Sequence, residues 1–148
     1  MPCPRTGIVA AIAIALLVGS AAIAPRGGAG DTPGGGEVQM HADAICGRAI
    51  GVTGRPSRPE NRRESIALAR ELSRVLRSTA SELRAVGAGD LAWAHQRWAA
   101  AIDDLRQTLR REEGSAKAVA TEMVARHEAA AAARTLGAKD CVRFARRA

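Results

Sequence analysis

Apolar side chains recur at helical spacing through most of the chain after residue 36. Positions three and four residues apart fall on one face of a helix, and four such stretches occur, at about residues 37–50, 57–86, 90–113 and 115–136. The side chains expected to face a shared core are Val38, Ala42, Ile45, Cys46, Ala49, Ile50, Ile66, Ala69, Leu72, Leu76, Thr79, Leu83, Val86, Leu91, Ala94, His95, Trp98, Ile102, Leu105, Leu109, Val119, Ala120, Met123, His127 and Ala130. We therefore predict four amphipathic helices.

The breaks between these stretches carry residues that cap or terminate helices. Ser57 followed by Glu60 forms a capping box, in which each side chain accepts a hydrogen bond from the other residue's backbone N–H. Gly87 should end the second helix, Asp90 cap the third, and Gly137 end the fourth. Short connections place consecutive helices side by side and antiparallel, so we expect an all-α fold, an up-down-up-down four-helix bundle. Because many core positions are alanine, the core should be thin.

A different pattern precedes these helices, because the run from Gly7 to Ala24 holds 18 residues without a charge. As a helix it would span roughly 27 Å, close to the thickness of about 30 Å of a membrane's hydrocarbon core. Arg5 and the free amino terminus precede the run, so the positive-inside rule keeps the amino end in the cytoplasm. We expect the rest of the chain to be extracytoplasmic.

Two interpretations of residues 1–24 stay open, a retained transmembrane anchor and a cleaved signal peptide. Ala22 and Ala24 form an A-x-A cleavage site, but Pro25 would follow that cut, and proline suits an extended protease substrate poorly. A cut after Ala22 is a further option. The first interpretation predicts a single-pass membrane protein with its N-terminus inside, and the second predicts a secreted protein.

Composition separates a linker from a folded domain. Residues 25–36 are rich in glycine and proline and lack apolar periodicity, which is typical of a flexible tether. Residues 37–148 are then one helical bundle domain, long enough to bury its own core. Aromatic residues make up 2% of the chain, and helix formers far outnumber strand formers, so the composition also favours an all-α fold.

The three cysteines divide by the predicted topology. Cys3 precedes the apolar run, which places it on the cytoplasmic side or in a discarded peptide. Cys46 and Cys141 then remain outside, where an oxidising compartment favours a bond between them. Antiparallel order also returns the end of the fourth helix to the end where the first begins. We predict a stapling Cys46–Cys141 disulfide, because no C-x-x-C spacing favours redox chemistry.

Two cysteine motifs enclose a middle region rich in Ala, Leu and Arg. They are Ala-Ile-Cys at residues 44–46 and Leu-Gly-Ala-Lys-Asp-Cys at residues 136–141. With the apolar N-terminal segment and the Gly/Pro tether, this order resembles the uncharacterised small exported helical proteins of high-GC actinobacteria. The resemblance covers residues 43–142, and it implies a shared scaffold but no activity.

Residues that could carry chemistry do not form a recognisable catalytic or metal-binding set. His41, His95 and His127 fall on different predicted helices, and none has a second ligand one turn away, as helical metal sites need. Asp103 and Asp104 are adjacent, so they diverge around a helix and cannot share a proton. No G-x-S-x-G motif or phosphate-binding glycine loop occurs. We expect no enzymatic activity, no metal and no cofactor.

The formal net charge of +7 does not by itself identify a partner. Charges are spread along the helices at spacings that allow local pairs, such as Glu71 with Arg74, and export argues against nucleic acid. Positive charge is concentrated only in the tail after Cys141, which we expect to be frayed. Its basic residues are candidate contacts with an anionic surface. These residues are Arg143, Arg146 and Arg147.

The two tryptophans lie five residues apart and so point to different sides of the third helix. Trp98 fits the core, whereas Trp93 is expected to be partly exposed beside Arg97, as at a partner surface. His95 and His127 complete this candidate surface for a partner or ligand. The sequence thus predicts a non-enzymatic structural or protein-interaction module of the cell envelope, which contacts the cytoplasmic membrane and an envelope protein or anionic surface. The alternative is a small-molecule or metal-binding sensor domain.

Overall fold

The computed structural model describes residues 34–54 and 59–148. These two ranges contain five helices, which are α1 (Gly35–Thr53), α2 (Arg62–Ala85), α3 (Gly89–Arg111), α4 (Ala116–Leu136) and α5 (Lys139–Arg147). The predicted all-α class is confirmed. The apolar run and residues 25–33 of the predicted tether lie outside the part of the chain that the structure describes. Within that part, no helix combines the length and apolar character needed to span a membrane.

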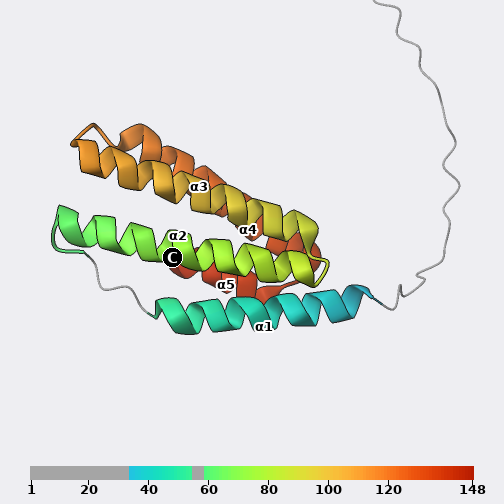
Figure 1. Ribbon diagram of the computed structural model, residues 1–148. Helices are drawn as coiled ribbons and strands as arrows, with labels where there is room; N and C mark the ends of the chain where they lie inside the picture. Colours follow the sequence, from blue (N-terminus) through green and yellow to red (C-terminus); the bar gives the residue numbers. More distant parts are fainter. Residues whose placement is uncertain (1–33, 55–58) are drawn as a thin grey trace, which may run out of the picture. The chain divides into compact units, whose positions relative to one another are not determined.

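Each helix packs against the next one along the chain, and α5 returns to pack against α1 (Figure 1). The core between them contains few large side chains. The largest of those that are completely or almost completely buried are Trp98, Phe144, Leu76, Leu83 and Leu91. Alanine fills many of the other core positions, as expected, so the helices lie close together and the stability of the fold depends on a small apolar volume.

Helix α2 begins later than predicted. Its N-cap is Asn61, whose side chain accepts a hydrogen bond from the backbone N–H of Glu64 at 2.9 Å, while the Glu64 carboxylate accepts from the N–H of Glu60 at 2.8 Å. The predicted start at Ser57 is therefore wrong. Residues 59–61 are not helical, and the run of helix formers begins only after Asn61.

Helix α1 is longer than predicted at both ends. It starts at Gly35, inside the predicted tether, and it continues through Gly51 to Thr53. The helix stops at Gly54, whose φ of 61° lies in the left-handed region that glycine adopts without steric cost. Each glycine inside a helix destabilises it by about 1 kcal/mol relative to alanine. The burial of Cys46 and Ala49 in the same helix outweighs that cost.

Helix α3 is capped differently from the prediction. Ala88 is the N-cap residue and makes no side-chain cap hydrogen bond, while Asp90 lies inside the first turn. The predicted left-handed exits are present, with a φ of 84° at Gly87 after α2 and of 79° at Gly137 after α4. Asp90 still contributes at this end of the helix, because a carboxylate in the first turn interacts favourably with the helix dipole.

The buried face of α4 differs from the face that the sequence predicted, and only Ala130 belongs to both. Val119 and Met123 are 40% and 44% exposed, and Ala120 and His127 are exposed as well. The buried residues of this helix are all alanines, at positions 118, 125, 129, 130 and 133. Apolar residues lie all around this helix, so their spacing does not define one face. The alanine face lets α4 approach α3 and α5 most closely, and this close packing decides which face of α4 is buried.

The tail after Cys141 is helical, contrary to the expectation of a frayed terminus. Helix α5 buries Cys141, Phe144 and Ala145, which are spaced to fall on one face of the helix. Phe144 is the only phenylalanine of the chain, and it is 1% exposed. Burial of this aromatic ring, together with the covalent attachment of Cys141, holds the last segment against the bundle.

Candidate functional site

His95 and Trp98, two of the residues predicted to form a partner or ligand surface, lie inside the core. Both are completely buried and pack against Phe144 of α5. The His95 ring stacks on Phe144 with 6.1 Å between centroids, and the Trp98 and Phe144 centroids are 5.7 Å apart. These two residues hold α3 against α5. Phe144 was not among the residues predicted to face the core, although it and Val142 are the large apolar side chains after Leu136.

His95 is an uncharged core residue. Its Nδ1 lies 2.9 Å from the carbonyl oxygen of Leu91 and donates a hydrogen bond there, and no described residue gives its Nε2 a hydrogen-bond partner. Burial lowers the pKa of His95 below its ordinary value of 6.5, and the hydrogen bond to Leu91 opposes that shift only in part. The ring therefore stays neutral around pH 7 and fills space between helices.

Trp98 connects the core to the surface of α4. Its indole Nε1 donates a hydrogen bond to Oε1 of Glu122 at 2.9 Å, and Nε of Arg126 lies 3.7 Å from the same oxygen. Glu122 thus pairs with Arg126, and its carboxylate is shared with the core. Because the carboxylate is held from two sides, Arg126 has a fixed position at the edge of α4 that faces α5.

The predicted disulfide between Cys46 and Cys141 is confirmed, with 4.9 Å between the two Cα atoms. It joins the middle of α1 to the first turn of α5. Two hydrogen bonds support this junction: Gln39 Nε2 donates to the carbonyl oxygen of Gly137 at 2.9 Å, and Asp43 Oδ1 accepts from the backbone N–H of Asp140 at 2.7 Å. Helices α1 and α5 are therefore bound to each other covalently and by polar contacts.

Trp93 and Arg97 lie on the outer surface, as predicted. Trp93 is 57% exposed, and the Arg97 guanidinium carbon lies 4.8 Å from the centroid of its ring. Arg97 also pairs with the Glu128 carboxylate of α4 at 3.0 Å. A cation–π contact and an ion pair together hold the Arg97 side chain, and this fixes the arrangement of an exposed aromatic ring where α3 meets α4.

A groove of about 590 Å³ continues from Arg97 between α3 and α4. Small and apolar side chains make up most of its wall, and charged groups stand at its ends. The lining residues are Arg97, Ala100, Ala101, Asp104, Lys117, Ala120, Thr121, Val124 and Ala125. Val124 is 57% exposed, so an apolar side chain faces solvent in the middle of the groove. The exposed Trp93 and this groove form one continuous surface, which we call the α3–α4 face.

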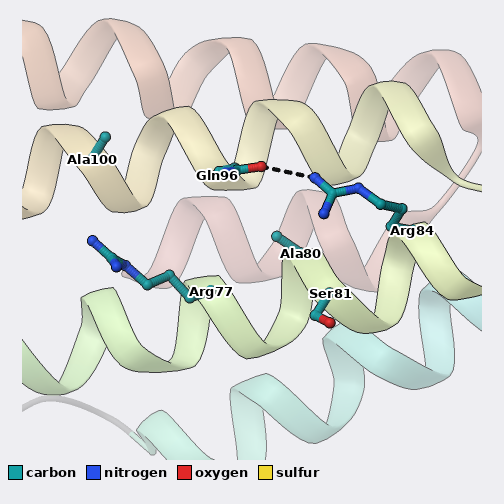
Figure 2. A pocket seen from close by; sticks show the side chains of 6 residues that line it. All are labelled: Arg77, Ala80, Ser81, Arg84, Gln96 and Ala100. Carbon is teal, nitrogen blue, oxygen red and sulfur yellow. Dashed lines mark hydrogen bonds between the residues drawn. The ribbon is translucent and has the colours of Figure 1, made fainter.

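A smaller hollow of about 240 Å³ lies between α2 and α3 (Figure 2). Arg77 and Arg84 flank it, with Ala80, Ser81, Gln96 and Ala100 between them. Arg84 Nη2 donates to Gln96 Oε1 at 2.8 Å, and Arg77 pairs with Asp103, which also pairs with Arg106. Both guanidiniums are used to link α2 to α3, so this hollow has a structural explanation.

The remaining candidate residues are distributed over different surfaces. His127 is exposed, with its Nδ1 2.7 Å from the carbonyl oxygen of Met123, and it does not lie beside His95 or Trp98. Arg143 pairs with Asp140 at 3.3 Å, whereas Arg146 lines a hollow together with residues of α4. Within residues 34–54 and 59–148, no three His, Cys, Asp or Glu side chains are placed to hold a metal ion.

No family model, curated protein or solved structure matches this chain. The functional conclusion therefore depends on the side chains and surfaces of the molecule itself.

Proposed function

We propose that this chain is a non-enzymatic helical module of the cell envelope that binds a protein partner through its α3–α4 face. Its four longer helices would follow the up-down-up-down order, with α5 closing the bundle. The uncharged run at residues 7–24 supports a location outside the cytoplasmic membrane, either anchored or secreted. The observation that carries the proposal is the exposed Trp93, which Arg97 holds in place at one end of an apolar groove.

The chemistry of this face indicates the kind of partner. Tryptophan and arginine are enriched among the residues that dominate binding energy at protein interfaces. The alanines along the groove allow another backbone to come close, and Val124 offers an apolar contact in the middle. A partner helix with an apolar stripe fits this surface, with its ends placed near the charges of Arg97 at one end and Asp104 and Lys117 at the other.

The proposal can be tested in cells of the native organism by site-specific crosslinking. A photoreactive amino acid in place of Trp93 is expected to crosslink the full-length chain to one defined envelope protein. The matched control places the same amino acid at Leu68, which is 38% exposed on α2 and so lies away from the α3–α4 face. The position of the crosslink on the partner then identifies the segment that occupies the groove.

Binding by the purified partner gives the quantitative test. Trp93→Ala should weaken the complex roughly tenfold or more, as expected for an interface residue that carries much of the binding energy. Leu68→Ala should leave the affinity unchanged. Equal crosslinking from both positions, or unchanged affinity with Trp93→Ala, would show that this face is not the binding surface.

A further inference from the structure

A second hollow, of about 350 Å³, lies between α4 and α5 and is lined mainly by basic side chains. Its lining residues are Arg126, His127, Ala130, Arg134, Ala145 and Arg146. Three of the six are arginines and one is a histidine, while the two alanines bring no polar side chain. We propose that this hollow binds a phosphate group.

The arrangement of the basic residues follows from helix geometry. Arg126, Ala130 and Arg134 are spaced four residues apart, so they follow one stripe of α4 over roughly 12 Å. Ala145 is buried beside this stripe, and the adjacent Arg146 supplies a third guanidinium from α5. Two helices therefore bring three guanidiniums to one hollow, although their residues are separated in sequence.

Neighbouring acidic residues neutralise this cluster only in part. Arg126 pairs with Glu122 through Nε at 3.7 Å, a distance longer than a hydrogen bond. The ion pairs found among the described residues include neither Arg134 nor Arg146. The sequence also has no Asp or Glu between Glu128 and Asp140 and none after Asp140. Positive charge thus gathers around the hollow without a carboxylate on its wall.

The helix dipole explains why Arg134 and Arg146 each lie at the end of a helix, but it does not explain why both side chains line the same hollow. Arg134 and Arg146 lie in the last turns of α4 and α5, where a cation interacts favourably with the helix dipole. Two arginines that point away from each other would interact with the helix dipoles equally well. Like charges around one hollow repel, whereas an anion between them converts the repulsion into attraction.

Phosphate fits this donor set better than a carboxylate does. Guanidinium groups bind phosphate oxygens through paired N–H donors, and several guanidiniums can share one phosphate because it offers oxygens in different directions. The hydrogen bond from His127 Nδ1 to Met123 leaves Nε2 of that ring for a further contact at the rim. The phosphate could belong to a free phosphomonoester or to the diester headgroup of a phospholipid, since both present the same oxygens.

Calorimetric titration of the full-length chain at low ionic strength, in mild detergent, tests the proposal. One arm uses inorganic phosphate and the other uses glycerophosphoglycerol, a water-soluble diester headgroup. We expect binding in at least one arm. The double substitution Arg134→Gln with Arg146→Gln should weaken it at least about tenfold, because each arginine contributes charge-assisted hydrogen bonds.

The matched control is Arg110→Gln with Arg111→Gln, which removes the same charge from exposed positions at the end of α3. It should retain the affinity of the unmodified chain, apart from a small general effect of net charge. Tighter binding of inorganic phosphate would indicate a free phosphate or monoester as the ligand, and tighter binding of the diester would indicate a lipid headgroup.

Absence of heat in both arms, or an equal loss of affinity in the control variant, would overturn the proposal. Circular dichroism of each variant shows whether helix content is kept, and the single variant Arg126→Gln gives an independent measure from the other end of the hollow. The hollow and the α3–α4 face share no lining residue, so phosphate binding and partner binding can succeed or fail separately.

Discussion

Asp43 shows how a single side chain joins two distant parts of the chain. Its carboxylate lies in the middle of α1, yet it accepts the backbone N–H of Asp140, 97 residues later, in the first turn of α5. The N-cap residue of α5 is Ala138, which makes no side-chain cap hydrogen bond. Asp43 therefore performs a capping function from a neighbouring helix, and α5 depends on α1 for its start.

Asp43→Ala should lower the free energy of unfolding by about 1 kcal/mol, the usual cost of losing a helix cap. Urea denaturation followed by circular dichroism measures this difference. Asp104→Ala is the control, because Asp104 is exposed within α3 and its replacement should not lower stability by more than a few tenths of a kcal/mol. If the two variants were equally stable, the hydrogen bond to α5 would contribute nothing.

His95 makes the stability of the fold depend on pH. Its pKa is lowered in the folded state by burial, so below pH 6.5 the unfolded chain binds more protons at this residue than the folded chain does. The contribution of the neutral ring is thus fully present above pH 6.5 and is lost as pH falls toward the pKa of the folded state. The slope for a single proton is at most about 1.4 kcal/mol per pH unit.

Free energies of unfolding measured between pH 7.5 and 5 should therefore fall with decreasing pH in the unmodified chain. His95→Phe keeps a ring beside Phe144 and should flatten this dependence. If the free energy of unfolding depended on pH in the same way with and without His95, other groups would be responsible for the loss of stability in acid.

At the scale of elements, the turn between α4 and α5 decides the course of the chain's last segment. Gly137 has a φ of 79°, and a Cβ placed on it would lie 3.2 Å from the side chain of Gln39 on α1. The left-handed conformation lets the chain reverse, and the same residue gives its carbonyl to Gln39. The reversal and the docking of α5 on α1 therefore depend on one small residue.

Gly137→Ala should cost about 1–2 kcal/mol of folding free energy, because an L-residue pays that much in the left-handed region. The crowding against Gln39 adds to this cost. In a Gln39→Ala background, which lacks both this crowding and the hydrogen bond to Gly137, the substitution should cost less by the part that is due to crowding. Thermal unfolding of the single and double variants measures both parts. Gly114→Ala is the control, since nothing lies within 4 Å of a Cβ at that position.

The sequence predicted helices at α1, α2, α3 and α4, although not all of their ends, but it misassigned part of the buried face of α4 and did not predict α5. In α2 and α3, polar residues separate the apolar stripe, so Leu76, Leu83 and Trp98 could be assigned to the core. In α4, alanine and other apolar residues occupy all sides, and only contact with neighbouring helices selects the buried face. The local pattern at residues 139–147 is too short to identify a helix, and its order comes from Phe144 and Cys141.

The candidate surface could be predicted only in part. Trp93 and Arg97 were recognisable because Trp93 falls off the apolar stripe of its helix, and the structure places the arginine over the ring. The convergence of Arg126 and Arg134 with Arg146 could not be predicted, because it requires α5 to pack against α4. The sequence did assign His95 and Trp98 to the core face of their helix, but it could not indicate that Phe144 covers them, because Phe144 belongs to an element expected to be frayed.

At the scale of the whole molecule, the bond between Cys46 and Cys141 closes a loop with a sequence separation of 95 residues. Helices α2, α3 and α4 lie wholly between the two cysteines, and α1 and α5 lie partly between them. Such a bond restricts the unfolded chain, and for a loop of this length the restriction is worth about 4 kcal/mol. That contribution is large for a fold whose core consists mainly of alanine.

Replacement of both residues, by Cys46→Ser with Cys141→Ser, should lower the free energy of unfolding by about 4 kcal/mol. Urea denaturation of the full-length chain with and without reductant should show the same difference, whereas Cys3→Ser should have no effect. If the double variant were as stable as the unmodified chain, the disulfide would not contribute to the free energy of unfolding.

The same bond also determines how the molecule carries mechanical load. If residues on the N-terminal side of Cys46 are held by the envelope and a partner pulls on residues after Cys141, the tension passes along α1, across the sulfur atoms and into α5. Residues 47–140 lie off this covalent path, so α2, α3 and α4 bear little of this force. A module of this kind could be stretched between two attachment points while its exposed α3–α4 face keeps its shape.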